Sequence, residues 1–349
     1  MTAPRSQIVN LEETRYFHCI SRCVRGARLC GGECEHRKEW LENRVEELAG
    51  IFAMSIGSFA VLDSHFHLVL RLDGKEVVDK WSDKEVAERW GRIYPPRGKN
   101  RKPIPVSEEW IKERCADDEW ITRMRGRLAN LGWFMKCLKE PLSRMANRQD
   151  GCRGAFWESR YKSIAVLDDM ALLATCVYSD LNVFAAGLCD LPENSPHTSL
   201  KVRMENCLNR KRAAGLDSAL TLVGRGEVVS DEQAAELEEG LWLCPLSSAV
   251  ENRFGAKRML EGLSLAHYLD LVESTSRLAR EGKNRLSETT PTLLERLGTT
   301  VETWEKTIRT LLGRKRELGV AFSFSRSRLR EAAAHRGCHH LANLNGCPA

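Results

Sequence analysis

The spacing of apolar residues along the first half of the chain indicates which segments are strands and which are helices. Four short segments are rich in aromatic and β-branched residues, as is typical of strands: 14–23, 54–63, 65–70 and 156–167. Apolar residues three or four positions apart, with charges between them, predict helices over 36–53, 75–93, 117–147 and 170–182. The order is strand, helix, strand, strand, helical insertion, strand, helix.

This order predicts an α+β fold of the split βαβ, or ferredoxin-like, kind, with an antiparallel sheet and helices on one face. After Gly187 the composition changes, and few strand candidates follow. We therefore expect two parts: residues 1–190, and a mostly α-helical C-terminal region, residues 191–349. The basic helices of the second part either have solvated faces or bind DNA or another partner. Amphipathic segments of the second part are 231–243, 249–260, 264–280, 291–297, 301–318 and 327–335.

Composition narrows the class of protein. Hydrophobic residues make up 42% of the 349 residues and charged residues 29%, as in ordinary globular proteins. The net charge of +5 is compatible with a nucleic-acid partner without requiring one. No apolar stretch approaches the length of a transmembrane helix, and the polar N-terminus does not resemble a signal peptide. We expect a cytoplasmic protein without membrane contact, whose 13 cysteines are reduced.

A cysteine-rich segment near the N-terminus has two interpretations. Cys19 and Cys23, and again Cys30 and Cys34, are separated by three residues, and His36 follows. Such spacings occur in structural zinc sites. However, the first pair falls at the end of a predicted strand, and no later pair completes the set. Zinc binding and simple burial of the thiols both remain open.

The segment VLDSHFHLVL, residues 61–70, carries the first candidate site. Residues two apart on a strand point to the same face, so His65 and His67 lie side by side while Phe66 points away. Two imidazoles can bind a divalent metal but are too few to hold it alone. The alternative is that both histidines pack in the core.

A second candidate pair lies on the helix predicted over 170–182. Tyr178 and Asn182 are four residues apart and so share the edge of its apolar stripe. Taken alone, the tyrosine is compatible with packing and the asparagine with a helix end.

Basic residues supply candidate contacts to a nucleic acid. The proline-rich link 94–106 contains Arg97, Lys99, Arg101 and Lys102, which are either available to a partner or part of a solvated loop. Arg160 and Lys162 would share one face of the fourth strand. The helical insertion carries Arg123, Arg125, Arg127, Lys136, Lys139, Arg144 and Arg148.

Three motifs in this order, HFHLVL, then FWESRYKS, then VYSDLN followed by AAGL, resemble the HUH-type single-tyrosine transposases. These are the insertion-sequence 200/605 class and its domesticated relatives, the REP-associated tyrosine transposases. The resemblance covers about residues 14–190. The chain as a whole also resembles the longer family members, which carry a helical C-terminal region.

The resemblance implies roles for the candidate residues. The family's His-hydrophobic-His strand binds Mg²⁺ or Mn²⁺, which implies His65 and His67 as ligands. It also implies Tyr178 as the nucleophile and Asn182 as the polar residue that completes the metal site. The chain departs from the family pattern at Val183, where a proline is usual, and at Ala185, where an arginine is usual.

The implied activity is metal-dependent cleavage of single-stranded DNA and strand transfer through a covalent 5′-phosphotyrosine. The residue types suit that chemistry, because a metal can withdraw charge from a phosphate while a phenolate attacks it. The expected partner is single-stranded or hairpin DNA, and the expected location is the cytoplasm, with the nucleoid. Alternatives are a domesticated, non-catalytic DNA-binding regulator of the same fold and a zinc-organised interaction protein. The chain acts either as a monomer or as a homodimer.

Overall fold

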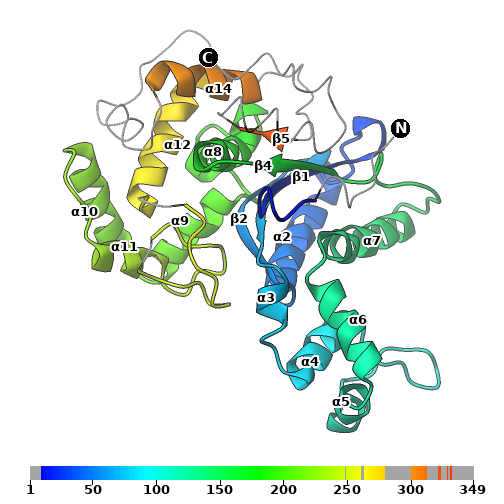
Figure 1. The fold of residues 1–349 in the computed structure, drawn as a ribbon. Helices are drawn as coiled ribbons and strands as arrows, with labels where there is room; N and C mark the ends of the chain where they lie inside the picture. Colours follow the sequence, from blue (N-terminus) through cyan, green and yellow to red (C-terminus); the bar gives the residue numbers. More distant parts are fainter. Residues whose placement is uncertain are drawn as a thin grey trace.

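A mixed sheet forms the centre of the molecule (Figure 1). The computed structural model describes residues 9–247, 249–260, 263–279, 300–312 and 321–323, together with Arg328 and Glu331. Within that part of the chain the strand order is β2-β3-β1-β4-β5, and all pairs except β4–β5 are antiparallel. The strands are β1 (Tyr16–Arg22), β2 (Met54–Val61), β3 (His65–Leu72), β4 (Lys162–Val166) and β5 (Ala321–Phe322).

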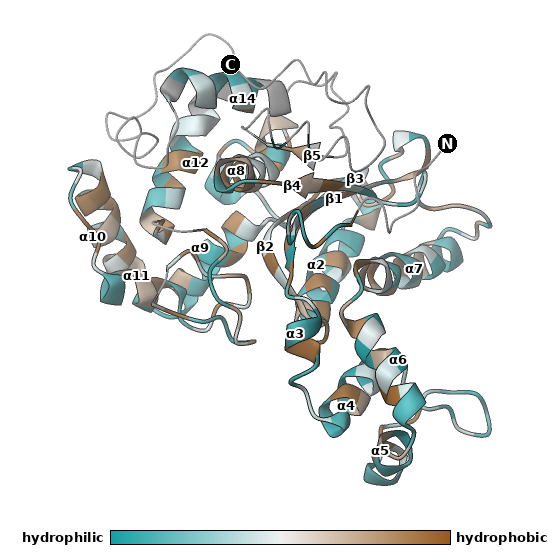
Figure 2. Ribbon diagram, viewed as in Figure 1, coloured by the Kyte–Doolittle hydropathy of each residue, from teal (hydrophilic) through white to brown (hydrophobic). Residues whose placement is uncertain are grey.

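Helices α2 (His36–Ala49) and α7 (Leu131–Gln149) belong to a single apolar cluster with one face of the sheet. Leu48 of α2 and Leu138 of α7 are fully buried in this cluster with Phe17 of β1. Figure 2 shows strands β1 and β4 as mainly apolar. The strands and these two helices have the order and pairing of the ferredoxin-like fold, which confirms the predicted class.

Helix α7 contains Pro141, which has no N–H to donate to the carbonyl of Cys137 one turn earlier. The Nε of Arg44, on α2, donates to that carbonyl at 3.3 Å. A side chain of the neighbouring helix thus compensates for the missing backbone hydrogen bond and joins α2 to α7.

Four helices form an insertion between β3 and α7, which projects from the sheet in Figure 1. The expected helices 75–93 and 117–147 are each divided in two. The breaks occur where Ser82 and Asn130 accept hydrogen bonds from backbone N–H groups three residues later and so begin new helices. The helices of the insertion are α3 (Lys75–Val78), α4 (Asp83–Ile93), α5 (Glu108–Cys115) and α6 (Asp118–Leu128).

The other face of the sheet is also covered, so the expectation of helices on one face holds only for α2 and α7. Every residue of β2 is buried, which requires a layer on both sides of the sheet. Helix α8 (Asp169–Ala185) supplies this layer and contacts β2 and β3. The C-terminal helices α12 (Leu265–Ala279) and α14 (Val301–Leu312) pack in turn against α8.

The described part of the chain after residue 190 is mostly helical, as expected, and also includes α9 (Ser199–Asn209), α10 (Ala213–Gly224) and α11 (Asp231–Glu238). The helix predicted over 249–260 is wrong. The side-chain oxygen of Asn252 accepts from the N–H groups of Phe254 and Ala256 and holds this segment in a turn. Segment 291–297 and almost all of 327–335 lie outside the described residues.

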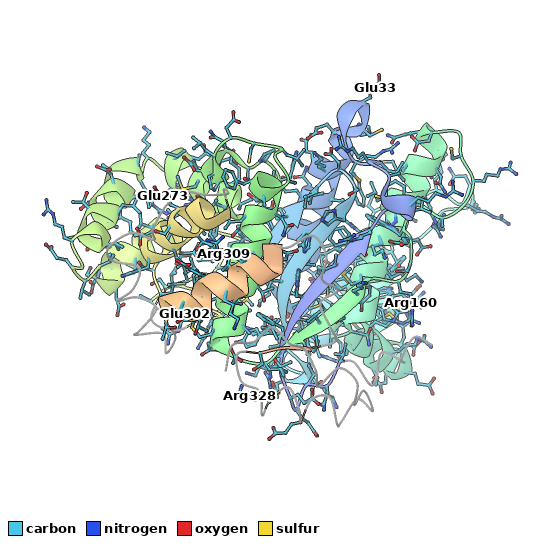
Figure 3. All side chains as sticks on the ribbon, turned by 90° about the horizontal axis from the view of Figure 1, so that it is seen from above. Glu33, Arg160, Glu273, Glu302, Arg309 and Arg328 are labelled. Carbon is cyan, nitrogen blue, oxygen red and sulfur yellow. The ribbon has the colours of Figure 1, made fainter. Side chains whose placement is uncertain are left out.

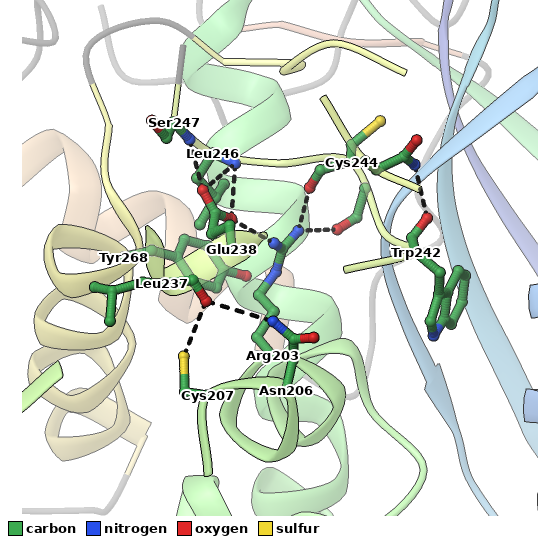
Figure 4. Close-up of polar contacts among 12 residues, drawn as sticks. Arg203, Asn206, Cys207, Leu237, Glu238, Trp242, Cys244, Leu246, Ser247 and Tyr268 are labelled. Atoms are coloured by element: carbon green, nitrogen blue, oxygen red, sulfur yellow. Dashed lines mark hydrogen bonds and ion pairs between the residues drawn. The ribbon is translucent and has the colours of Figure 1, made fainter. Parts of the chain in front are cut away.

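A buried ion pair connects the C-terminal helices to the sheet (Figure 4). The guanidinium of Arg203 lies 3.0 Å from the carboxylate of Glu238 and donates to the carbonyls of Gly57, on β2, and Cys244. Glu238 accepts further hydrogen bonds from the backbone N–H groups of Leu246 and Ser247. Both buried charges are therefore compensated, and together they join β2, α9 and α11. No described helix has the length and apolar character needed to cross a membrane.

Candidate metal and nucleophile site on the sheet

The register of β3 places His65 and His67 on the face covered by α8. His67 pairs with Ile20 of β1, and His65 pairs with Arg22. Cross-strand partners share a face, and the two histidine rings, 5.0 Å apart, both point toward α8. His67 is only 2% exposed, whereas His65 is half-buried.

A third histidine, which the sequence reading missed, lies against this pair. Nε2 of His18, on β1, is 2.9 Å from Nδ1 of His67, and the two rings stack with centroids 5.1 Å apart. His18 is 2% exposed. Its position two residues before Ile20 was visible in the sequence, but its contact depends on the strand register, which local patterns do not give.

Burial keeps all three imidazoles neutral at ordinary pH. Burial lowers the pKa of His18 to about 3 and, with the charge of Arg22, that of His65 to about 4. Burial and the neighbouring histidines hold the pKa of His67 well below its usual value. Neutral imidazole is the form that binds metals, so these shifts favour a ligand role.

His67 has one ring nitrogen available. Its Nδ1 is occupied by His18, while its Nε2 is buried and has no hydrogen-bond partner among the described residues. If Nδ1–H donates to His18, the lone pair of Nε2 remains for a ligand. An unpartnered buried nitrogen is costly, and a metal ion bound there would satisfy it.

Tyr178 lies on α8 directly above the histidines. The Asp168 side chain accepts from the N–H of Ala171 and begins this helix. The Tyr178 ring meets His67 edge-on at 5.4 Å between centroids and His18 at 6.1 Å. Burial raises the pKa of Tyr178, while a hydrogen bond from Asn182 and the charge of Arg22 act in the opposite direction.

Asn182 follows Tyr178 by one turn and is half-buried. Its Nδ2 donates to the backbone carbonyl of Tyr178 at 2.9 Å. This hydrogen bond identifies the nitrogen of the amide and leaves Oδ1 as the atom that can bind a cation. Helix α8 continues to Ala185, so Asn182 does not end it.

The donor set fits a cation that keeps water ligands. Among the described residues, no group of three or more His, Cys, Asp or Glu side chains could hold a metal ion. Two imidazole nitrogens and one amide oxygen leave positions for water and substrate, as Mg²⁺ and Mn²⁺ require. The segment from Cys19 to His36, which the structure describes in full, contains no such group of ligands either.

Arg22, the last residue of β1, was also missed. It is exposed and lies opposite His65, and its charge acts on the pKa values of His65 and Tyr178. The site thus contains a cation close to the phenol and the histidines.

The predicted DNA-binding residues are not all near the site. Arg97, Lys99, Arg101 and Lys102 are exposed in a loop of the projecting insertion, away from α8 (Figure 1). Lys162, by contrast, pairs with Ile20, which also pairs with His67, so it lies on the histidine face.

The fourth strand begins at Lys162, later than expected, so Arg160 and Lys162 do not share a strand face. The N–H of Val24 donates to the Phe156 carbonyl, and the N–H of Glu158 donates to the Arg22 carbonyl. These two bonds hold the preceding segment irregularly beyond the end of β1.

Compared with protein-family models, with curated proteins and with solved structures, the chain shows no significant match.

Proposed function

We propose that this protein cleaves single-stranded DNA with the help of a divalent metal and transfers the strand through a covalent bond to Tyr178. The observation that carries the proposal is the edge-on contact of Tyr178 with His67, whose buried Nε2 has no partner in the described chain. A phenol, a nitrogen suited to a metal and an exposed arginine meet at one place.

The residues would divide the work as follows. His65, His67 and Asn182 would hold Mg²⁺ or Mn²⁺, which supplies Lewis-acid activation of a phosphate oxygen when bound. The phenol of Tyr178 would lose its proton to water, and its oxygen would attack phosphorus. The bond to the 3′ oxygen would break, and the leaving oxyanion would take a proton from water to become a 3′-OH. Arg22 and the Asn182 amide stabilise the phenolate against the burial that raises its pKa.

The product is a 5′-phosphotyrosine, which a second 3′-OH can attack to restore the phenol and join two strands. The proposed substrate is single-stranded or hairpin DNA, because an unpaired strand can present one phosphate in line with the phenol. The proposal places the protein with DNA in the cytoplasm and includes a homodimer as one assembly to test.

A second candidate is a non-catalytic DNA-binding regulator of the same fold. Two observations favour it: burial raises the pKa of Tyr178, and no group of three or more His, Cys, Asp or Glu side chains in the described chain is arranged to hold a metal ion. In this case DNA binds without being cut.

A covalent adduct separates the two functions. A hairpin oligonucleotide labelled at its 3′ end is incubated with the protein and Mn²⁺ and then run on a denaturing gel. The 3′ label should migrate with the protein, whereas a 5′ label should appear on a shorter free fragment. Tyr178→Phe should bind the DNA and form no adduct. His67→Gln should lose the adduct formation that depends on Mn²⁺. Binding without any adduct from the native protein would favour the regulator.

A further inference from the structure

A second hollow lies on the α7 side of the sheet. It has a volume of about 570 Å³ and lies between α7 and the segment that precedes β4. Met135, Trp157 and Tyr161 contribute apolar surface to it. This size falls within the range of roughly 300–1,000 Å³ that is common for small organic ligands.

Cations surround the apolar surface. Lys136, Lys139, Arg144 and Arg160 line the hollow, against the single carboxylate of Glu140. Glu140 is paired with Arg144. Lys136 and Arg160 are exposed, and neither forms an ion pair with any residue that the structure describes. The hollow therefore suits an anionic ligand that also has an apolar part.

Trp157 is held rigidly at this place. Its ring packs edge-on against Phe66 and Phe156, and its Nε1 donates to the carbonyl of Lys139 at 3.1 Å. The Lys139 ammonium lies 5.3 Å from the Trp157 ring centroid. A fixed aromatic ring beside cations is the arrangement on which unpaired bases stack while their phosphates meet the positive charges.

The start of β4 separates this hollow from the candidate site. Arg160 and Tyr161 line the hollow, whereas Lys162 lies in the same row across the sheet as His67. Two strand spacings separate Lys162 from His67, or about 10 Å. Figure 3 shows Arg160 at the β4 edge of the molecule.

We propose that the hollow binds an unpaired segment of single-stranded DNA that flanks the phosphate attacked by Tyr178. The segment would cross the start of β4, with Arg160 on one side and Lys162 on the other. The inference rests on the proposed function for the identity of the substrate. The hollow, with a volume of about 570 Å³, is in the size range of a small organic ligand, and its fixed aromatic ring favours an unpaired base over a paired one.

The test measures binding without cleavage. In the Tyr178→Phe background with EDTA, the affinity for a fluorescent oligothymidylate is determined at several salt concentrations. The slope of log affinity against log salt is negative, and each phosphate that is no longer neutralised should reduce its magnitude by about 0.7 for single strands. Lys136→Gln with Arg160→Gln should therefore reduce the magnitude of the slope by about 1.4. The matched control Lys211→Gln with Arg225→Gln removes two exposed cations from the turns that follow α9 and α10 and should leave the slope unchanged.

The outcomes separate the hollow from the catalytic proposal. An unchanged slope in the Lys136 and Arg160 variant overturns the hollow, even if the native protein forms the adduct. If the Lys136 and Arg160 variant has a weaker salt dependence but the native protein forms no adduct with Mn²⁺, the hollow is supported and the catalytic function is rejected. An equal loss for a duplex of the same length overturns the assignment to an unpaired strand.

Discussion

Nε2 of His18 and Nδ1 of His67 are 2.9 Å apart in the interior of the sheet, and each side chain is only 2% exposed. The contact determines which nitrogen of His67 remains available, and that nitrogen, Nε2, has no partner within the described chain. His18 therefore acts as a positioning residue for the proposed metal ligand.

The first prediction concerns this contact. His18→Leu removes the hydrogen bond to His67 and should weaken Mn²⁺ binding by about 10- to 100-fold, as when other metal-bound histidines lose their hydrogen-bond partners. His18→Gln can place an amide oxygen where Nε2 was and should retain most of the affinity. Calorimetric Mn²⁺ titration of the DNA-free protein measures both. A Leu variant that binds Mn²⁺ like the native protein would show that His18 only packs.

The second prediction concerns Asn182. Asn182→Asp retains an oxygen at the same place and should retain adduct formation, although it loses the donor to the Tyr178 carbonyl. Asn182→Leu supplies no ligand and should raise the Mn²⁺ concentration needed for cleavage by about tenfold or more. The yield of adduct against Mn²⁺ concentration is the measurement. Equal titrations for the Leu variant and the native protein would assign the third position to water.

The third prediction concerns the basic loop with Arg97, Lys99, Arg101 and Lys102, which lies on the projecting insertion. Neutralising all four should reduce the magnitude of the slope of log affinity against log salt by about 0.7 for each phosphate that the loop binds, but only for DNA long enough to reach the insertion. A short oligonucleotide should bind with an unchanged slope. If neutralising the loop changes the salt dependence for neither long nor short DNA, the loop is a solvated loop. If it changes both equally, the loop lies closer to the cleavage site than the structure places it.

The fourth prediction concerns acid stability. The pKa of His18 is lowered to about 3 and that of His67 well below its usual 6.5, so the unfolded chain binds more protons than the folded one below pH 6.5. The free energy of unfolding should therefore fall as the pH drops from 6.5, by about 1.4 kcal/mol per pH unit for each buried histidine.

Urea unfolding between pH 6.5 and 5, with EDTA present, measures this dependence. His18→Gln should remove about one histidine's share of the slope, whatever its effect on stability at neutral pH. If His18→Gln leaves the pH dependence of the free energy of unfolding unchanged, the lowered pKa of His18 does not contribute to acid stability.

The fifth prediction concerns the attachment of α8 to the C-terminal helices. The Tyr268 hydroxyl, on α12, donates to the buried carboxylate of Asp180 at 2.5 Å. Tyr268→Phe leaves that carboxylate oxygen without its donor and should cost about 1–3 kcal/mol in urea unfolding. The control Tyr16→Phe removes a longer, 3.3 Å bond from a half-buried hydroxyl to the Met259 carbonyl and should cost less. If both variants lose the same free energy of unfolding, the hydrogen bond to Asp180 contributes no more to stability than the bond from Tyr16.

Local spacing in the sequence was sufficient for much of the fold and for part of the site. The strand and helix order follows from apolar periodicity, because a strand repeats every two residues and a helix every 3.6. For the same reason His65 and His67 share a face, and Tyr178 and Asn182 share a helix edge. The helix predicted over 249–260 failed because the side chain of Asn252 stabilises a turn that apolar spacing does not report.

The contacts between residues that are far apart in the sequence were decided by the tertiary structure alone. His18 and Arg22 reach the site through the register of β1 against β3, and Trp157 reaches the second hollow through irregular backbone beyond the end of β1. Helix α9 is joined to β2 by the hydrogen bond from Arg203 to the carbonyl of Gly57, two residues that are far apart in the chain. Register and layer order depend on how distant apolar faces pack together, and no local period in the sequence encodes that pairing.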